Sequence, residues 1–181
     1  MTAAPGSGRT EESATTRPPA EADAPVLATR AGGLLTVTIN RPRKRNAMSR
    51  EALAALEAAF DEAARDPDIR CAVVTAAGEA SFAAGGDLKD LAEIRTDAEA
   101  RAFAAEAKAT LGAIRDFPVP VVAAVNGDAL GGGAEVAIAA DMRVFAPHAR
   151  IGFIQGRLAI TTAWGGASDL LRLVGPATAL R

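Results

Sequence analysis

The stretch Val119–Ala139, VPVVAAVNGDALGGGAEVAIA, decides the fold prediction for this chain. An apolar β-branched run ends at Asn126-Gly127, and three consecutive glycines then lead into an alanine-rich helix that carries Glu135. Because Gly131–Gly133 have no Cβ, a ligand can approach this backbone closely, and the helix that begins there offers unpaired N–H groups and a positive dipole end. Glu135 lies about one helical turn from any oxygen held by the backbone of Gly132. A backbone oxyanion donor beside a carboxylate indicates chemistry at an activated carbonyl.

Two other glycine-rich motifs fit this stretch less well. A phosphate-binding P-loop needs Lys and Ser/Thr after its last glycine, whereas Gly133 is followed by Ala134-Glu135. A dinucleotide-binding fingerprint normally opens its fold, whereas this glycine run lies past the middle of the chain. The absence of tyrosine also excludes a Tyr-dependent short-chain dehydrogenase. The remaining alternative is a helix packed tightly on a strand, without a ligand.

An earlier glycine loop favours a ligand site. Ser81–Leu88 reads SFAAGGDL and follows an apolar run at Cys71–Thr75. Asp87 is placed to cap the helix that follows. Paired with NGDALGGGAE at 126–135, this loop resembles the crotonase (enoyl-CoA hydratase/isomerase) superfamily. Two further stretches agree with the same family in the same order, TVTINRPRKRNAMS at 36–49 and AWGGASDLLRLVG at 163–175.

The resemblance implies a fold, an activity and a set of site residues. The fold is α/β, a crotonase-like spiral of ββα units. The activity is acyl-CoA chemistry of the enoyl-CoA hydratase/isomerase type, a lyase reaction on a CoA thioester without any other cofactor or metal. Gly86 and Gly132 match the positions whose N–H groups hold the thioester oxygen as an enolate develops, and Glu135 is the acid/base. The expected substrate contacts are Lys44, Ala84, Gly85, Asp87 and Gly131. The family also implies a trimer-based homo-oligomer if the full-length chain exists. We expect the protein in the cytoplasm.

Position 155 departs from the hydratase pattern. Hydratases of the family have a second glutamate twenty residues after the first, and that position is Gln155 here. Hydration of an enoyl thioester needs a base that activates water and an acid that protonates the α-carbon, and glutamine has no titratable proton. Two alternatives remain open. One is an altered chemistry such as acyl-CoA decarboxylation, because TTAWGG at 161–166 resembles the corresponding stretch of some family members with such chemistry. The other is a weak or inactive relative of the hydratases. Asp128 is the only other acid in the glycine segment, so it is the candidate proton donor besides solvent.

Composition indicates one soluble domain. The chain has 181 residues, of which 49% are apolar and 23% charged, and its net charge of −2 gives no reason to expect nucleic acid or an anionic membrane as partner. We expect a disordered tail at 1–24 and the core domain at 25–181, because the first segment has no periodic apolar pattern. We also expect no secretory signal and no membrane span, since there is no h-region and no run of about 18 apolar residues.

Strand and helix patterns alternate along the core. Strands are expected at 34–40, 69–75, 121–125, 141–146 and 150–153, and helices after Ser49, at 98–117 and at 168–174. This alternation predicts an α/β fold. Pro176–Arg181 resembles the first turns of another helix, and crotonase-like chains continue for several helices more. We therefore expect a domain that is incomplete at its C-terminus, either a truncated gene product or a family remnant with a modified role.

Several residues support alternatives from other classes. A non-catalytic remnant that binds CoA or a partner subunit is one, and an RNA binder using the basic run Arg41–Arg45 is another. That run lacks interleaved aromatic residues, which favours a solvated loop or, by the resemblance, contacts to CoA phosphates. His148, in a Pro-His-Ala-Arg turn, is expected to be a surface residue rather than a base. Cys71 is expected to be a buried small hydrophobe, and Trp164 to pack over a turn near the acyl pocket.

Overall fold

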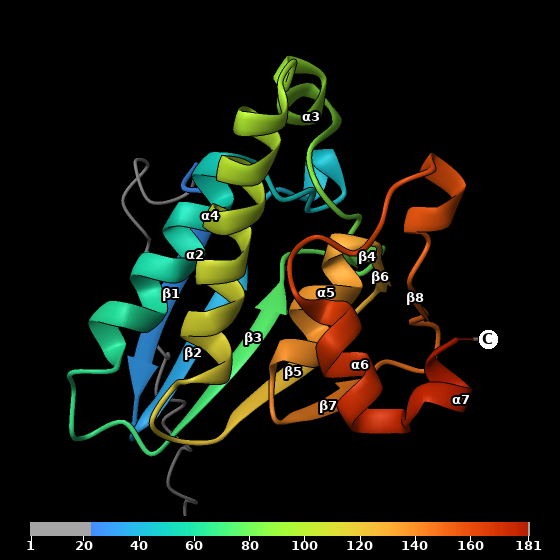
Figure 1. Cartoon of the computed structure of the whole chain (residues 1–181). Coiled ribbons are helices and arrows are strands. Elements are labelled where there is room, and N and C mark those ends of the chain that lie inside the picture. Colours follow the sequence, from blue (N-terminus) through green and yellow to red (C-terminus); the bar gives the residue numbers. More distant parts are fainter. Residues whose placement is uncertain (1–22, 181) are drawn as a thin grey trace, which may run out of the picture.

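The computed structural model describes residues 23–180, so the first 22 residues of the predicted tail and Arg181 lie outside the described residues. In this part of the chain, five strands form a larger sheet in the order β1-β2-β3-β5-β7 and three form a smaller one in the order β4-β6-β8 (Figure 1). Only β1 and β2 pair antiparallel; the other neighbours are parallel. The strands are β1 (Val26–Ala31), β2 (Leu34–Ile39), β3 (Cys71–Ala76), β4 (Ser81–Ala83), β5 (Val121–Val125), β6 (Asp128–Leu130), β7 (Met142–Phe145) and β8 (Ile151–Gly152).

The same unit of two strands and a helix occurs three times in succession. Each unit gives its first strand to the larger sheet and its second strand to the smaller one. The units are β3-β4 with α3 (Leu88–Glu93) and α4 (Asp97–Arg115), β5-β6 with α5 (Gly132–Ala139), and β7-β8 with α6 (Gly166–Val174). This arrangement confirms the predicted α/β class and the spiral of ββα units.

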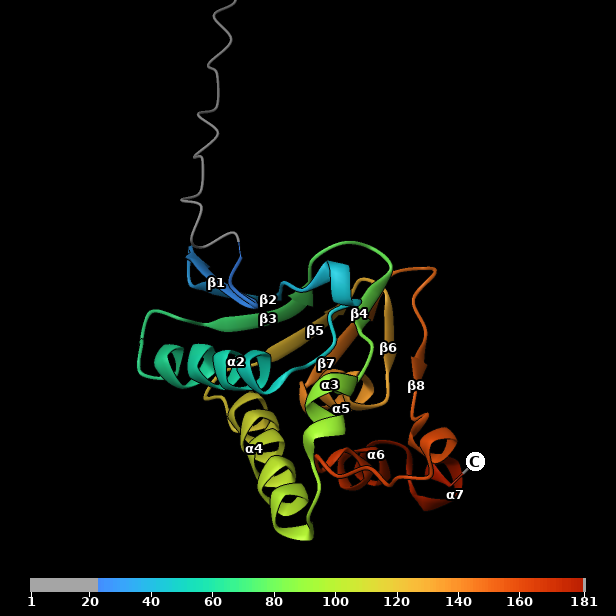
Figure 2. The same cartoon turned by 90° about the horizontal axis from the view of Figure 1, so that it is seen from above.

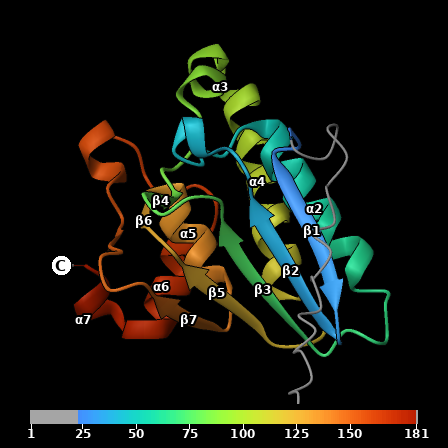
Figure 3. The same ribbon diagram turned by 180° about the vertical axis from the view of Figure 1, so that it is seen from behind.

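The helices on one face of the larger sheet enclose the core. Helix α2 (Arg50–Ala63) lies along the sheet, whereas α4 packs against α2 and runs away from the sheet (Figure 2), and the view from behind shows the sheet in front of both helices (Figure 3). Ser49 caps α2 by accepting a hydrogen bond from the Ala52 amide at 3.2 Å, as the sequence predicts. Alternate residues of β2 and β3 are buried against the helices, which explains why their pattern was recognisable.

The structure differs from the sequence predictions at several short elements. Strands β1, β4 and β6 and the 3₁₀ helix η2 (Gln155–Leu158) were not predicted. Cys71 is half-buried rather than buried, because as the first residue of β3 it lies on the side of the strand that faces away from the helices. His148 is exposed, with its Nε2 2.9 Å from the Glu79 carbonyl oxygen, which confirms the surface position. Between residues 23 and 180, no helix is long and apolar enough to cross a membrane.

Candidate active site

A cavity of about 870 Å³ lies where the two glycine loops, helices α3 and α4 and the segment 154–164 meet. Apart from Asp128, the site residues expected from the sequence all line it: Lys44, Ala84, Gly85, Gly86, Asp87, Gly131, Gly132, Glu135 and Gln155. A smaller groove of about 450 Å³ between α2 and α4 contains none of them. The fold therefore gathers residues from four separate stretches of sequence around one space.

The two glycine loops touch each other at this cavity. A Cβ placed on Gly85 would lie 3.2 Å from the Leu130 carbonyl oxygen and 3.6 Å from the Gly132 nitrogen. The first loop is held by Met48, whose amide donates to the Gly85 carbonyl at 2.8 Å and whose carbonyl accepts from the Asp87 amide at 3.0 Å. These two hydrogen bonds use the Gly85 carbonyl and the Asp87 amide, and they leave the Gly86 N–H without an acceptor.

The second loop leaves a matching N–H group. Gly132 is the first residue of α5, where an amide has no acceptor within its own helix. In the described part of the chain, neither the Gly86 nor the Gly132 amide donates a hydrogen bond to another protein group. Two N–H groups on adjoining loops therefore have no acceptor among the described residues.

Asp87 ties the first loop to the basic segment before it. Its carboxylate caps α3 by accepting from the Lys89 amide at 3.1 Å and forms an ion pair with Arg41 at 2.8 Å. The hydrogen bond from Arg41 is the main reason that the pKa of Asp87 lies below its ordinary value. The capping prediction is confirmed, and the ion pair keeps this carboxylate charged instead of making it a proton donor.

Glu135 is a buried carboxylate held by three donors. Its side chain, on α5, is only 2% exposed. Gln155 Nε2 donates to Oε1 at 2.9 Å, and the amides of Trp164 and Gly166 donate to Oε2 at 3.2 and 2.8 Å. A Cβ on Gly166 would lie 2.4 Å from the Glu135 Cγ, so only glycine permits this approach. Burial raises the pKa of Glu135 above its ordinary value, although the three donors lower it.

Gln155 has one polar atom with a partner and one without. The residue is 7% exposed and is the first residue of η2. Because Nε2 faces the Glu135 carboxylate, Oε1 points elsewhere, and it is the one buried side-chain polar atom among the described residues that has no hydrogen-bond partner. A buried carbonyl without a donor costs free energy. An atom of this kind on a cavity wall is suited to accept an O–H or N–H of a ligand.

Comparison with known proteins identifies the family. The family model for enoyl-CoA hydratase/isomerase matches residues 29–181. The chain belongs to the enoyl-CoA hydratase/isomerase family. The short-chain-enoyl-CoA hydratase of Clostridium acetobutylicum is 37% identical over 150 residues, which cover 83% of this chain and 57% of that protein. The crotonyl-CoA hydratase of Syntrophomonas wolfei is 38% identical over 146 residues, which cover 81% and 56%.

Solved structures of the enoyl-CoA hydratase/isomerase family share the fold. An enoyl-CoA hydratase from Bacillus anthracis matches with a TM-score of 0.81 at 33% identity, over 86% of this chain and 60% of that one. The predicted crotonase-like fold is therefore confirmed. The chain spans just over half the length of the curated relatives described above.

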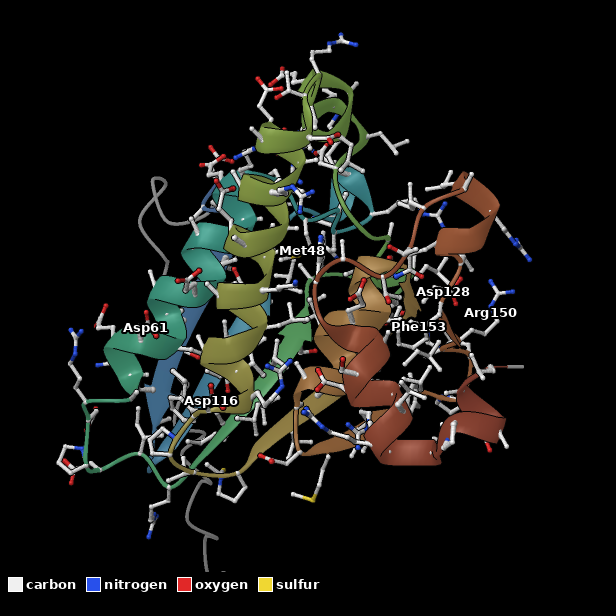
Figure 4. The ribbon with its side chains drawn as sticks, in the orientation of Figure 1. Met48, Asp61, Asp116, Asp128, Arg150 and Phe153 are labelled. Atoms are coloured by element: carbon white, nitrogen blue, oxygen red, sulfur yellow. The ribbon has the colours of Figure 1, made fainter. Side chains whose placement is uncertain are left out.

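Asp128 does not lie where the sequence suggested a proton donor. It is on β6 and is not among the residues that line the cavity. Its carboxylate forms an ion pair with Arg150 at 2.6 Å (Figure 4), and the hydrogen bonds from Arg150 lower its pKa. A charged, paired carboxylate outside the cavity cannot protonate a ligand there, so this candidate is removed.

The cavity also has lining residues beyond the expected site residues. Arg45 and Trp164, which the resemblance suggested as a contact to CoA phosphates and a neighbour of the acyl pocket, both line it. Most of the remaining lining residues are apolar, and they include Leu91, Ile94, Phe103, Ala104 and Ile160. The helical spacing of Phe103 predicted only that it faced inward. Nothing in the sequence indicated which cavity it would line.

An ion pair with a buried carboxylate holds α6, the helix whose Gly166 amide donates to Glu135. Asp169 of α6 is buried and pairs with Arg115, at the end of α4, at 2.5 Å. Replacing Arg115 by Met leaves this buried carboxylate with only the exposed Arg172. We expect Arg115→Met to lower the free energy of unfolding by about 1–3 kcal/mol. Chemical denaturation measures it.

The matched control is Arg172→Met, because Arg172 pairs with the same Asp169 but its side chain is 75% exposed. Exposed pairs contribute little, so this variant should stay within about 0.5 kcal/mol of the parent chain. Equal losses for the two variants would contradict the assignment of the Arg115 pair as the stabilising one.

The raised pKa of Glu135 predicts a pH-dependent cost to stability. A carboxyl whose folded pKa is raised stabilises the fold most below its unfolded pKa, and this contribution is lost as pH rises through the folded pKa. In Glu135→Gln no charge is buried, and the Gln155 amide can turn so that its Oε1 accepts from the new Nε2. We expect the variant to melt about 2–4 °C above the parent at pH 8, which corresponds to about 1 kcal/mol of stability. At pH values below the ordinary Glu pKa of 4.5, this difference in melting temperature should shrink.

Thermal unfolding followed by circular dichroism at both pH values measures this difference. Glu93→Gln, on the exposed surface of α3, is the control and should leave the melting temperature unchanged at either pH. A Glu135→Gln variant less stable than the parent at pH 8 would mean that burial does not destabilise the charged form.

Proposed function

We propose that this chain is an acyl-CoA enzyme of the enoyl-CoA hydratase/isomerase type. The Gly86 and Gly132 N–H groups would hold the thioester oxygen while an enolate develops, and Glu135 would transfer the proton. The observation that supports this is the meeting of two unused backbone donors and one buried carboxylate in a single cavity. Each donor of such an oxyanion hole is worth about 3–4 kcal/mol of transition-state stabilisation.

The lining of the cavity suits the two parts of an acyl-CoA. Lys44 and Arg45 line it and would face the CoA phosphates. The apolar walls formed by Leu91, Phe103 and Trp164 would face the acyl group. The proposed chemistry uses no cofactor other than the CoA of the substrate.

Hydration of a short enoyl-CoA is the reaction we favour. Two of the relatives are named as short-chain-enoyl-CoA and crotonyl-CoA hydratases. A water molecule could donate one O–H to Gln155 Oε1 and the other to Glu135 Oε1, which has accepted only one hydrogen bond. As the water oxygen bonds to the β-carbon, Glu135 takes its proton, and the resulting carboxylic acid returns a proton to the α-carbon of the enolate.

Acyl-CoA decarboxylation is the second candidate, because it needs an enolate holder but no second carboxylate. Gln155 in place of the second glutamate favours it. The free acceptor atoms of Glu135 and Gln155 disfavour it, since a substrate carboxylate would face them without a donor. Measuring crotonyl-CoA hydration and malonyl-CoA decarboxylation side by side decides between the two. Decarboxylation without hydration would overturn the favoured reaction.

Gly132→Ala tests the proposed oxyanion donor. A Cβ at Gly132 would lie 2.2 Å from the Trp164 ring, so this variant must move the amide or the ring. Displacing one donor should lower turnover by about 10²–10³-fold. Gly156→Ala is the matched control, since a Cβ there meets no atom within 4 Å. Full activity in Gly132→Ala, measured by loss of the enoyl absorbance, would contradict the proposed role.

A further inference from the structure

The side chain of Trp164 lies directly over both glycine loops. A Cβ on Gly132 would lie 2.2 Å from Cζ3 and 2.4 Å from Cη2 of the indole, and a Cβ on Gly86 would lie 3.4 Å from Cζ2. The six-membered part of the ring therefore spans the two residues whose N–H groups are unused. It forms a wall of the cavity at the point where a bound thioester would begin its acyl chain.

The ring is held in this position from several sides. Trp164 is 6% exposed, and its own amide donates to Glu135 Oε2 at 3.2 Å. Phe103 packs edge to face on the indole, with ring centroids 6.1 Å apart and planes at 71°. The Arg50 guanidinium lies 5.1 Å from the centre of the Phe103 ring. This clamped indole cannot swing aside as an exposed side chain would.

We propose that Trp164 sets the acyl-chain length that the site accepts, by closing the cavity a few carbons beyond the thioester. This inference rests on the proposed acyl-CoA function. The indole lines the same cavity as the apolar residues Leu91, Ile94, Ala100, Phe103 and Ala104. Removing the indole would add its volume to this apolar part of the cavity and make room for a longer apolar chain.

The side chain can be changed without removing the contact to the carboxylate. The hydrogen bond to Glu135 comes from the backbone of Trp164, so any residue except proline retains it. The indole side chain and the main-chain amide therefore have separable roles. A replacement at 164 that keeps the fold should alter chain-length preference more than it alters the chemistry.

Binding of saturated thioesters tests the proposal without depending on turnover. Trp164 is the single tryptophan of the sequence, so its fluorescence reports directly on this wall. We expect butyryl-CoA to change the emission of Trp164 and to bind about tenfold more tightly than octanoyl-CoA, a ratio within the range that apolar pockets achieve. In Trp164→Ala, calorimetry should show the opposite order, with octanoyl-CoA binding more tightly than butyryl-CoA.

Trp164→Leu, which keeps apolar volume, serves as a second variant if Trp164→Ala does not fold, and it should shift the ratio in the same direction. Phe145→Leu, on the exposed edge strand β7, is the control and should leave the ratio unchanged. If the Trp164 variants bind both thioesters with the same affinity ratio as the parent chain, the proposed role of Trp164 is overturned and the proposed function is not. Absence of binding by any acyl-CoA to the parent chain would overturn the proposed function and this inference with it.

Discussion

Glu135→Gln lowers the turnover of crotonyl-CoA by about 10²–10⁴-fold, the contribution of a positioned general acid or base. In the proposed mechanism, Glu135 both accepts the proton of water and returns a proton to the substrate. Glutamine keeps the shape of the side chain and can still accept the amides of Trp164 and Gly166, but it cannot carry a proton. The loss should therefore fall on kcat while KM changes little.

Steady-state kinetics measures both constants, and Glu93→Gln on the surface should match the parent chain. Turnover by Glu135→Gln within a factor of about two of the parent would place the acid/base elsewhere. The expected rise in its melting temperature at pH 8 distinguishes a lost proton carrier from a damaged fold.

Gln155→Glu raises the hydration of crotonyl-CoA by a comparable factor, about 10²–10⁴-fold. The new carboxyl would stand where Gln155 Nε2 now lies 2.9 Å from Glu135 Oε1. Two carboxyl groups this close cannot both ionise at neutral pH, so one stays protonated and supplies a second proton carrier, whereas in the parent chain Glu135 must act as both base and acid. The pH dependence of the rate should then be bell-shaped, because activity requires that the two carboxyl groups share one proton.

Gln155→Met is the matched comparison, since methionine has a similar length and no amide. It should bring hydration below the parent level, because the unpartnered Oε1 proposed to hold water is removed. Robust hydration by the parent chain that Gln155→Glu leaves unchanged would mean that a second carboxyl at position 155 adds nothing to the proton transfer. The interpretation of position 155 would then be wrong.

The sequence was sufficient to predict the structure in two situations: where a pattern repeats over many residues, and where the backbone geometry allows only one residue type. The alternating strand at 34–40 and the capped helix after Ser49 belong to the first kind. Gly132 and Gly166 belong to the second, since Trp164 and Glu135 occupy the places where a Cβ would stand. These local constraints, together with the order of four motifs, led to the family and to every predicted residue of the cavity.

Other features depend on contacts that no local pattern records. Strands β4 and β6 have three residues each, too few to show a period, and they pair across a long separation in sequence. Asp128 lies seven residues from Glu135 in the sequence, yet Arg150 pairs with it outside the cavity. The edge-to-face contact of Trp164 with Phe103 joins segments that are far apart in the chain. Long-range packing decides such arrangements. The sequence could therefore indicate which residues matter but not which partners they contact in the fold.

The vibration of a bound thioester carbonyl tests the central claim most directly. Butyryl-CoA labelled with ¹³C at the carbonyl can be studied by isotope-edited infrared difference spectroscopy, free and bound to this chain. If the Gly86 and Gly132 amides hold the oxygen, the bound carbonyl is polarised, its stretch lies below the free value, and Gly132→Ala moves it back towards that value. A bound carbonyl that vibrates at the frequency of free butyryl-CoA, in the parent chain and in Gly132→Ala alike, would contradict the proposed oxyanion hole.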